Sequence, residues 1–545
     1  MRVLLVRPPI YSRTLRFPAG PRFGLPTSLL YLAAVLERAC IDVKIYDALI
    51  DFTWHDMKPD KNGNYLVGPP WDVFASKVLE YRPDLVGITN PFSDFAPYSI
   101  RAALEIKKRD AQIITVVGGP HATSAPESFL SKESPVDYVV RGEGETTIVK
   151  LALALSANRS VHQLLGISYR NGTQVRSNPP APFIERLDDL PLPAYHLVPM
   201  EKYFELVKAG FPSRYSFDYE GSEREVSLIT SRGCPYRCIF CGNHLHMGRR
   251  WRFHSATYVL RHMKFLIERY GVKHFHLEDD NITLRTDRFE GILDGIMQNG
   301  WPITWDTPNG IRADGLSPAL LKKIKESGCT YLCIGIESGD QHVLDNIIRK
   351  GLDLKSVVET VATCKMRRID MHAFYMIGFP GEELDQIYST FRFARRALWR
   401  YDVIPHVALA RPLPGTELYR ICQASGYLTE PVRPAIDGGW RSEVYQRIMI
   451  KTQAFSPADL DRLVTHFDRE VAAMIVFKVA MWLCAHPVIL KNAIMRFLQL
   501  VGQGLFLAVK RVFFGGLFFK FNYLNERLIG AARQSSGSRS RKLTA

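Results

Sequence analysis

The sequence predicts an α/β protein built from two parallel-sheet units, the second a partial (β/α)6 barrel, followed by a helical C-terminal extension. Short, continuously apolar strands alternate with helical segments, which is typical of parallel sheets covered on both faces. This alternation runs twice along the 545 residues. A Pro-rich stretch separates the two runs and indicates a domain boundary.

The first unit is a predicted doubly wound sheet. Helices are expected at 28–39, 98–108 and 145–155, and strands at 3–6, 43–46, 85–89, 113–117 and 138–140. Asn171-Gly172 predicts a hairpin over 167–175. Ligands of such sheets bind at the carboxyl ends of the strands, where the loops GGPHAT (118–123) and RGEGE (141–145) stand.

The second unit repeats the pattern after a connector that its prolines predict to be extended. Its strands are expected at 225–230, 273–278, 303–307, 331–337, 372–378 and 406–410. Six such units predict an open barrel whose strand ends face the chemistry. The predicted domains are the first sheet (1–177), the connector (178–222), the barrel (223–430), a helical, basic and apolar extension (431–532) and a disordered tail (533–545).

The beginning of the chain and its cysteines indicate a reducing compartment. The start MRVLLVRPP has a four-residue apolar run, which is too short for the apolar part of a signal peptide. We therefore expect a cytoplasmic protein. Its nine cysteines would then serve metal ligation or core packing and not a disulfide framework.

Positive charge is concentrated at the C-terminal end. The formal net charge is +15, and the residues from Val471 onward hold eleven Lys and Arg against one acid, or +10. Large aliphatic residues separate these bases, so nucleic acid is not expected as a partner. The longest uncharged run, Phe497 to Val509, has thirteen residues, too few to span a bilayer. The alternatives are peripheral membrane contact or access to a lipophilic substrate, against a cap on the barrel or an oligomer interface.

Three cysteines lie within eight positions of SRGCPYRCIFCGNH, directly after the first strand of the second unit. The thiolates of Cys234, Cys238 and Cys241 can bind three irons of a 4Fe-4S cluster and leave the fourth iron for another ligand. The alternative is a structural zinc site of these cysteines and His244. Phe240, between two of the cysteines, would shield a cluster from water or simply pack in the core.

Further segments follow in order at later strand ends. The cysteine loop resembles the signature of the radical SAM superfamily. The segments HLEDDNIT (276–283), IGIESGD (334–340), YMIGFPGEE (375–383) and RPLPGTELY (411–419) are similar to segments of its cobalamin-binding (class B type) family. PDLVGITNP, VVGGPHAT and DYVVRGEGET are similar to that family's cobalamin domain. The resemblance covers roughly residues 1–430 and implies three cofactors: a 4Fe-4S cluster, S-adenosylmethionine (SAM) and cobalamin.

The resemblance assigns the cluster to Cys234, Cys238 and Cys241, with the amino and carboxylate groups of SAM on the fourth iron. One electron would then cleave the sulfonium and give a 5′-deoxyadenosyl radical, while the protein positions and shields the cofactors. An electron donor such as flavodoxin or ferredoxin is expected. Glu337 and Ser338 match a position that contacts the amino acid or ribose of SAM, and a carboxylate suits an ammonium group.

Several of these positions have a structural alternative. Glu337 would form an ion pair with Arg312 instead. Gly378, Pro380 and Gly381 of the GFPG segment would bring backbone close to adenine, or form a tight turn, and both can hold. The paired carboxylates at 279–280 would orient substrate or SAM, or cap the following helix.

Cobalamin contacts are expected at Gly118 and Gly119, which let backbone approach a large flat ligand, and at His121. The motif Asp-x-His-x-x-Gly of methionine synthase-type domains, whose His ligates cobalt, does not occur, and His121 stands in Pro-His-Ala-Thr. The lower face of cobalt would then lack a protein ligand. Cys329 and Cys333 are expected to be core residues and not a second cluster.

These features predict a radical SAM C-methyltransferase that uses methylcobalamin to methylate an unactivated carbon of a small-molecule or lipophilic substrate. One alternative is a radical SAM cyclase or rearrangement enzyme of the tetrapyrrole ring-closure type, without methyl transfer. Another, from a different class, is a non-catalytic module that binds zinc and a corrinoid. Metal analysis distinguishes this module from the enzymes, because it would contain a single zinc and they would contain iron and sulfide.

Overall fold

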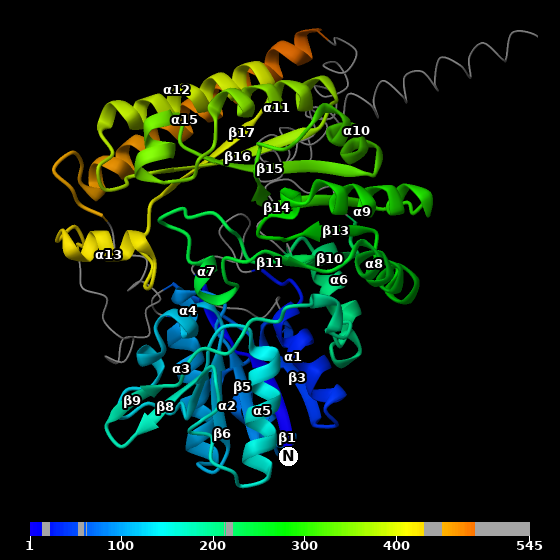
Figure 1. The fold of residues 1–545 in the computed structure, drawn as a ribbon, viewed down its shortest axis with the longest axis vertical. Helices are drawn as coiled ribbons and strands as arrows, with labels where there is room; N and C mark the ends of the chain where they lie inside the picture. The colour runs from blue at the N-terminus through cyan, green and yellow to red at the C-terminus, as the bar shows by residue number, and fades with distance from the viewer. Residues whose placement is uncertain are drawn as a thin grey trace, which may run out of the picture.

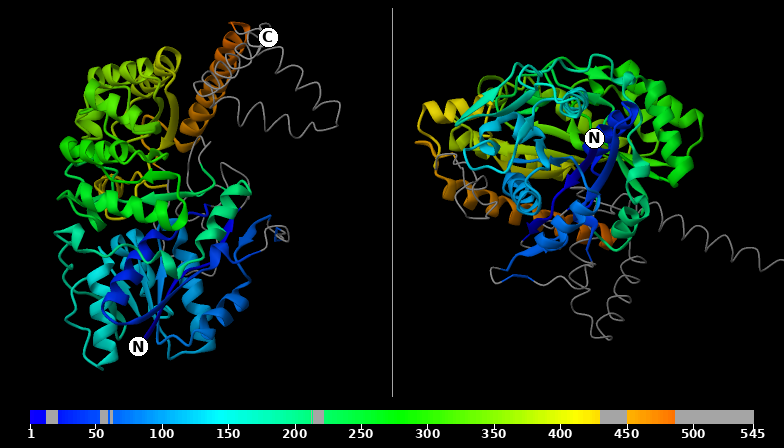
Figure 2. Two further views of the ribbon diagram at one scale, coloured as in Figure 1. Left: turned by 90° about the vertical axis from the view of Figure 1, so that its right-hand side faces the viewer. Right: turned by 90° about the horizontal axis from the view of Figure 1, so that it is seen from below.

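The computed structural model describes residues 1–12, 22–52, 59–60, 63–211, 213, 222–429 and 450–485. Two α/β units lie one above the other, and the N-terminal unit forms the lower half of Figure 1. A long helix, α15 (Pro457–Ala485), runs along the outside of the upper unit (Figure 1 and Figure 2). The predicted fold class, a parallel-sheet domain followed by a partial barrel, is confirmed.

The first sheet has seven strands in the order β3-β1-β5-β6-β7-β8-β9. The first five are parallel, and β8 and β9 add an antiparallel hairpin at one edge, as Asn171-Gly172 predicts. The strands are β1 (Arg2–Arg7), β3 (Asp42–Asp47), β5 (Leu85–Thr89), β6 (Ile114–Gly118), β7 (Tyr138–Val140), β8 (Ile167–Asn171) and β9 (Gln174–Ser177).

Helices cover both faces of this sheet because its strands are apolar on both sides. Side chains of α1 (Thr27–Arg38) and α5 (Gly144–Ser156) build the core on one face. Those of α2 (Trp71–Glu80) and α3 (Ala96–Arg109) build the core on the other. Helix α2 and the small ribbon of β2 (Ile10–Ser12) and β4 (Tyr65–Val67) were not expected from the sequence.

The connector is less extended than its prolines predict. Residues Met200–Lys208 form helix α6, whose Tyr203 hydroxyl donates to Asp47 of the first domain at 2.6 Å. The Tyr195 hydroxyl lies 3.0 Å from Nε2 of His262 in the barrel. The connector thus packs against both units through buried aromatic side chains. The predicted domain limits themselves stay predictions.

The barrel sheet has six parallel strands in chain order, β10-β13-β14-β15-β16-β17, so it is open between the first and the last. Its strands are β10 (Glu225–Leu228), β13 (His274–Leu277), β14 (Thr304–Ile311), β15 (Cys329–Glu337), β16 (Asp370–Ile377) and β17 (Ile404–Leu409). Its helices are α8 (Ala256–Tyr270), α9 (Thr286–Gln298), α10 (Pro318–Glu326), α11 (Leu354–Met366), α12 (Leu384–Tyr401) and α13 (Glu417–Ala424).

The described part of the C-terminal extension packs on the barrel. On α15, the Phe467 ring stacks on Phe391 of α12 at 4.6 Å between centroids, and Glu470 pairs with Arg395. Among the residues that the structure describes, no helix is long and apolar enough to cross a membrane. The predicted basic and apolar stretch beyond residue 485, and the predicted disordered tail, lie outside the described residues.

Candidate active site at the three-cysteine loop

A short antiparallel ribbon closes the cysteine loop. Strand β11 (Ser231–Arg232) pairs with β12 (Arg252–Phe253), with Arg232 directly opposite Arg252. Gly233 then turns the chain with φ +84°, and a Cβ there would lie 2.5 Å from the carbonyl oxygen of Arg250, so the turn requires glycine. The segment that carries the cysteines therefore leaves and re-enters the fold at one narrow stem.

The three cysteines are free thiols at intermediate exposure. The amide of Cys241 donates to the carbonyl of Cys238 at 3.2 Å. Burial raises the pKa of all three thiols, that of Cys241 to about 11. Lys350 opposes this rise at Cys238, because a nearby cation favours the thiolate. Three clustered thiols beside a cation fit the ligand set of an iron–sulfur cluster.

Aromatic packing covers one side of this loop. The Phe240 ring lies 5.9 Å from that of Phe379, between centroids, and the amide of Ile239 donates to the carbonyl of Ile348 at 3.0 Å. Phe240 thus packs against the barrel core. His244 is close to the loop as well, and its Nδ1 lies 3.1 Å from the carbonyl oxygen of Cys241.

Asp279 and Asp280 hold the stem of the loop, and neither caps the helix that follows. The carboxylate of Asp279 accepts from the Thr230 hydroxyl at 2.8 Å and the Ser231 hydroxyl at 2.5 Å. Asp280 accepts from the amide of Gly233 at 2.8 Å. The capping alternative is wrong, since α9 begins several residues later and its first turn has Arg285 at the N-cap. Burial raises the pKa of both carboxyl groups.

Glu337 pairs with Lys350 and not with Arg312. The Lys350 Nζ lies 3.0 Å from Glu337 Oε1, and both side chains are buried. Arg312 instead binds Asp314 at 2.5 Å. Its guanidinium lies 3.7 Å from the Tyr236 ring centroid. Glu337 also has φ +72°, a conformation that is strained for a non-glycine residue and is found most often at functional sites.

The other predicted SAM positions lie at the ends of β15 and β16. Ser338 is fully buried, and its hydroxyl lies 3.0 Å from that of Thr390. The turn of Gly378, Pro380 and Gly381 is tight, because Glu382 accepts from the amides of Gly378 and Phe379 at 2.7 and 3.0 Å. Burial raises the pKa of Glu382 to about 7. The tight-turn alternative therefore holds, and contact with SAM stays a prediction at all these positions.

Leu460 of α15 occupies one side of this turn. A Cβ on Gly378 would stand 2.5 Å from Leu460 Cδ1, and Gly378 has φ +88°. Helix α15 therefore covers Gly378 from the outside. Gly381 differs, since a Cβ there would meet only Ile347 at 4.0 Å.

The predicted cobalamin positions lie at the carboxyl end of β6. Gly119 is required by its own domain: it has φ +132°, and a Cβ there would lie 2.1 Å from the carbonyl oxygen of Asn90. A Cβ on Gly118 would meet ordinary contacts, the nearest at 3.7 Å. Packing within the domain thus accounts for Gly119, and contact of either glycine with cobalamin stays a prediction.

His121 lies in α4 (Pro120–Ser124), and its side chain is buried. Its Nδ1 is 3.1 Å from the Ser93 hydroxyl, and its ring makes an edge contact with Phe129. Burial lowers the pKa of His121 to about 4, so the imidazole is neutral at pH 7. A neutral imidazole can ligate a metal, and contact of His121 with cobalamin stays a prediction.

The two candidate sites face each other across the domain boundary. Helix α4 lies against α7 (Asn243–His246), the helix that directly follows Cys241. At this contact a Cβ on Gly415 would stand 2.7 Å from Leu245 and 3.4 Å from Ser124. The carboxyl end of β6 and the cysteine loop of the barrel therefore lie next to each other.

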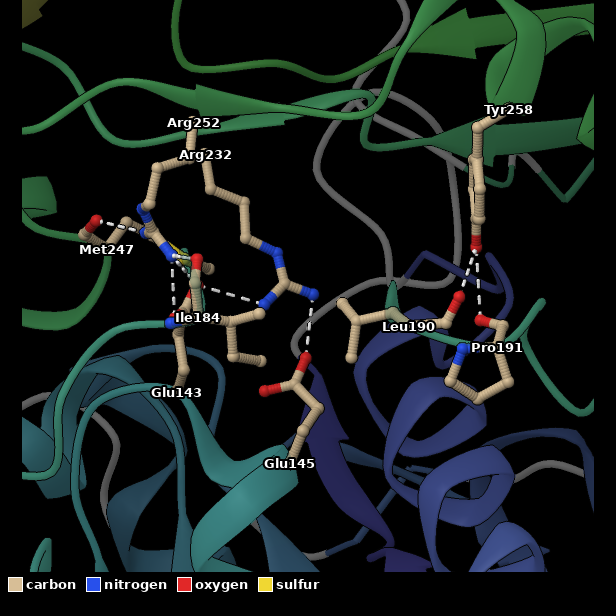
Figure 3. Close-up of polar contacts among 9 residues, drawn as sticks. All are labelled: Glu143, Glu145, Ile184, Leu190, Pro191, Arg232, Met247, Arg252 and Tyr258. Atoms are coloured by element: carbon tan, nitrogen blue, oxygen red, sulfur yellow. Dashed lines mark hydrogen bonds and ion pairs between the residues drawn. The ribbon is translucent and has the colours of Figure 1, made fainter. Parts of the chain in front are cut away.

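A buried ion-pair network joins these two sides (Figure 3). Glu143 and Glu145 come from the RGEGE loop and the start of α5, and Arg232 and Arg252 come from the stem of the cysteine loop. Sequence analysis placed the RGEGE loop at a strand end but assigned no role to these four residues, nor to Lys350. One feature of the sequence could have indicated a role for Arg232: it lies two residues before Cys234, next to the turn at Gly233.

Cys329 and Cys333 agree with their predicted role. Cys329 and Cys333 lie on β15 and are buried in the barrel, as expected for core residues. Burial raises the pKa of both thiols well above the ordinary value. Buried, protonated thiols of this kind behave as small apolar residues of the core.

Two family models match the chain: the Radical SAM superfamily over residues 228–394 and the B12 binding domain over residues 23–152. An uncharacterized methyltransferase of Pyrococcus horikoshii is 33% identical over 85% of this chain and 91% of its own length. The cytidylyl-2-hydroxyethylphosphonate methyltransferase of Streptomyces wedmorensis is 31% identical over 78% of this chain and 82% of its own.

Solved structures share the architecture. TsrM of Kitasatospora setae, a radical SAM methyltransferase with cobalamin and a 4Fe-4S cluster bound, superposes with a TM-score of 0.62 at 18% identity, covering 87% of this chain and 89% of that one. OxsB, a cobalamin-dependent SAM radical enzyme, gives 0.63 at 17% identity, covering 91% and 75%. At these identities the likeness concerns the fold.

The chain belongs to the cobalamin-binding family of radical SAM enzymes. Its cofactors are a 4Fe-4S cluster, SAM and cobalamin, and its predicted class, a cobalamin-dependent radical SAM methyltransferase, is confirmed. Enzymes of this kind take an electron donor and a small-molecule substrate. The zinc and corrinoid module is thereby set aside.

Proposed function

We propose that the protein methylates an unactivated carbon atom of a small organic molecule bound between the B12-binding domain and the barrel mouth. The observation that carries this proposal is the contact of α7, next to Cys241, with α4 at the carboxyl end of β6. This contact brings the predicted cluster loop next to the predicted cobalamin positions at the end of β6. Two reactive centres can share one substrate only if they are held in this way.

The residues present fit the three cofactors. Cys234, Cys238 and Cys241 would hold the cluster, and the remaining positions would contact SAM (Glu337, Ser338, Gly378, Pro380, Gly381) and cobalamin (Gly118, Gly119, His121). When bound, these groups supply reductive cleavage of SAM and a transferable methyl group. The protein supplies orientation and exclusion of water.

Three features of the chain perform that work. Asp279 and Asp280 fix the stem of the cysteine loop through hydrogen bonds at Ser231 and Gly233. Lys350 keeps a positive charge beside the thiols and holds the Glu337 carboxylate in place. The ring of Phe240 lies against Phe379 and covers the loop on the barrel side.

Ring closure of a tetrapyrrole is the second candidate. Anaerobic magnesium-protoporphyrin IX monomethyl ester cyclases are similar to this chain at 27% identity in Synechocystis and 24% in Cereibacter sphaeroides. The two methyltransferases above are more similar and cover more of the chain than the Synechocystis cyclase, which supports methyl transfer.

The electron donor, the cellular compartment and membrane contact are proposed from the sequence. Flavodoxin or ferredoxin would supply the electron, in a cytoplasmic setting, and nucleic acid is not a partner. Contact of the C-terminal extension with a membrane surface depends on residues outside the described ones. The packing of α15 on α12 supports a cap on the barrel for residues 457–485.

The test uses anaerobically reconstituted protein with cobalamin, a strong reductant, a cell extract as substrate source and SAM labelled at its methyl group. We expect 5′-deoxyadenosine and S-adenosylhomocysteine together, and label in a product. Formation of 5′-deoxyadenosine alone would favour cyclisation or rearrangement.

The matched variants are Cys238→Ala in the loop and Cys333→Ala in the barrel core. Cys238→Ala removes a cluster ligand and should abolish SAM cleavage, whereas Cys333→Ala should retain it. Retained cleavage in Cys238→Ala would contradict the cluster assignment.

A further inference from the structure

The network of Glu143, Glu145, Arg232 and Arg252, here the interdomain network, is fully internal and electrically balanced. Arg232 bridges the two carboxylates, at 3.0 Å to Glu143 Oε1 and 2.7 Å to Glu145 Oε1. Arg252 lies 2.8 Å from both oxygens of Glu143. All four side chains are buried, and two cations face two anions. Although burial opposes its charge, Glu145 and Glu143 raise the pKa of Arg232, so the Arg232 guanidinium stays charged.

Backbone and aromatic groups complete the network on both sides. Arg252 also donates to the carbonyls of Ile184 and Met247, at 2.8 and 2.7 Å, and the amide of Ile184 donates to Glu143 at 2.7 Å. The Arg232 guanidinium lies 5.5 Å from the centroid of the Tyr31 ring in α1. Figure 3 shows both guanidinium groups pointing from the barrel side toward the glutamates of the B12-binding domain. Satisfied buried networks of this kind are rigid.

The two arginines mark the two ends of the cysteine loop. They are direct partners in the β11–β12 ribbon, and residues 233–251 form the excursion between them. Side chains alternate along a strand. The Ser231 side chain binds Asp279 of the barrel, whereas the next side chain, Arg232, binds the B12-binding domain. The stem is thus held by the barrel on one face and by the other domain on the opposite face.

We propose that Arg232 and Arg252 are positioning residues that fix the separation of the cysteine loop from the cobalamin edge and so set how SAM is divided between its two uses. This inference rests on the proposed function, in which one SAM gives 5′-deoxyadenosine and another donates a methyl group and leaves as S-adenosylhomocysteine. Radical cleavage needs only the barrel and its loop. Delivery of a methyl group through cobalamin needs the two domains at a fixed distance.

The test compares Arg232→Lys and Glu145→Gln with the parent protein. A lysine cannot bridge two carboxylates as a planar guanidinium does. The glutamine keeps the shape of the side chain and removes one charge. We expect the ratio of S-adenosylhomocysteine to 5′-deoxyadenosine to fall about tenfold or more, because displacement of reacting groups by about 1 Å can cost this much. Cleavage itself should stay near the parental rate.

The matched control is Glu185→Gln. It removes an ion pair with Arg250, which belongs to the same loop, but both side chains are largely exposed, at 64% and 73%. The control should leave the ratio unchanged. If a single variant does not fold, the double variant Arg232→Gln with Glu145→Gln restores neutrality and keeps the Arg252–Glu143 pair.

Hydrogen–deuterium exchange of the full chain gives a second measurement, independent of turnover. Amides of residues 233–248 should exchange faster in Arg232→Lys and in the double variant than in the parent, and as in the parent in Glu185→Gln. An unchanged ratio together with unchanged exchange overturns the proposal, as does an equal loss of both SAM products. If the parent makes no S-adenosylhomocysteine, the proposed methyl transfer fails, and the exchange experiment alone decides the positioning role.

Discussion

The barrel interior and the domain boundary each contain a buried group of charges, built from different side chains. In the barrel, Asp306 on β14 lies 3.0 Å from His274 Nε2 and 2.8 Å from His276 Nδ1 on the neighbouring strand. At the boundary, arginines reach carboxylates about ninety to a hundred and ten positions away in sequence. Pairing of neighbouring strands brings Asp306, His274 and His276, here the barrel group, together. The interdomain network forms only when the two domains pack against each other.

This difference assigns the two groups different work. The histidine group ties adjacent strands and so belongs to the stability of one unit. It also titrates, because Asp306 and Glu225 overcome burial and raise the pKa of His276 to about 10. The guanidinium groups of the interdomain network keep their charge at all pH values of interest. They therefore hold the two domains in the same relative position over this range.

The largest effect is expected from Asp306→Ala. It removes the carboxylate that both buried histidines contact and leaves His276 with Glu225, at 3.6 Å. Removal of one partner of a buried ion pair costs about 3–5 kcal/mol of unfolding free energy. Urea unfolding of the cofactor-free protein, followed by circular dichroism, measures this. A loss below about 1 kcal/mol would place the histidine group among pairs of the weak, exposed kind.

Alkaline pH should weaken the barrel group and spare the interdomain network. Because the pKa of His276 is raised, its contribution is fully present below about pH 6.5 and is lost as pH rises toward about 10. A loss on the order of 5 kcal/mol follows from a rise of this pKa from 6.5 to about 10. The counterpart is acid: histidine holds the pKa of Asp306 below its usual range, so that contribution disappears as pH falls below about 3.8.

Thermal unfolding between pH 6 and 10 checks this prediction, with His276→Gln as the comparison. The variant should lose stability at pH 6 and show a flatter profile. Parallel profiles for the two proteins would show that His276 is not the titrating group.

A smaller effect is expected at the barrel mouth, where Lys350 and Glu337 form a single buried pair. Lys350→Met removes the cation that holds the Glu337 carboxylate, so SAM should bind about tenfold more weakly, or about 1.4 kcal/mol. Calorimetry on reconstituted protein measures the dissociation constant, and Lys350→Arg should recover part of the affinity. Equal affinity for SAM in the parent and both variants would show that Glu337 does not bind SAM.

The smallest effect concerns metal removal. Ligand atoms of His274, His276 and Asp306 lie within 4.8 Å of one another, a donor set that also suits a divalent metal. If the group is an ion pair, as the hydrogen bonds indicate, a chelator should leave the unfolding temperature of the cluster-free Cys238→Ala protein unchanged. If the chelator lowers the unfolding temperature and one added metal restores it, the three residues form a metal site and not an ion pair.

Sequence reasoning located the elements of the fold well, because apolar strands and Pro or Gly punctuation are local signals. All six barrel strands lie within a few residues of their expected positions, and β7 coincides with its predicted range. The sequence motifs also placed the three cysteines at the end of the first barrel strand. Helix α2 was not recognised, since it is short and begins directly after two prolines.

Partners of charged side chains could not be predicted in the same way. Glu337 was given Arg312 as its alternative partner, but strand ends and loops bring Lys350 to it instead. For Asp279 and Asp280 the sequence predicts that they orient substrate or SAM or cap a helix, and it does not predict their hydrogen bonds to the stem of the cysteine loop. Each of these contacts joins residues that tertiary structure alone brings together, so spacing along the chain carries no information about them.

The contact of Leu460 with Gly378 has a consequence for the order in which the protein is made. Phe455, Leu460 and Phe467 are buried in the same core as the barrel, although they follow its last strand by more than forty residues. A nascent chain that ends just after β17 therefore still exposes the apolar surface of the barrel that these side chains cover in the complete protein. The barrel mouth can reach its final form only after residues 455–467 have left the ribosome.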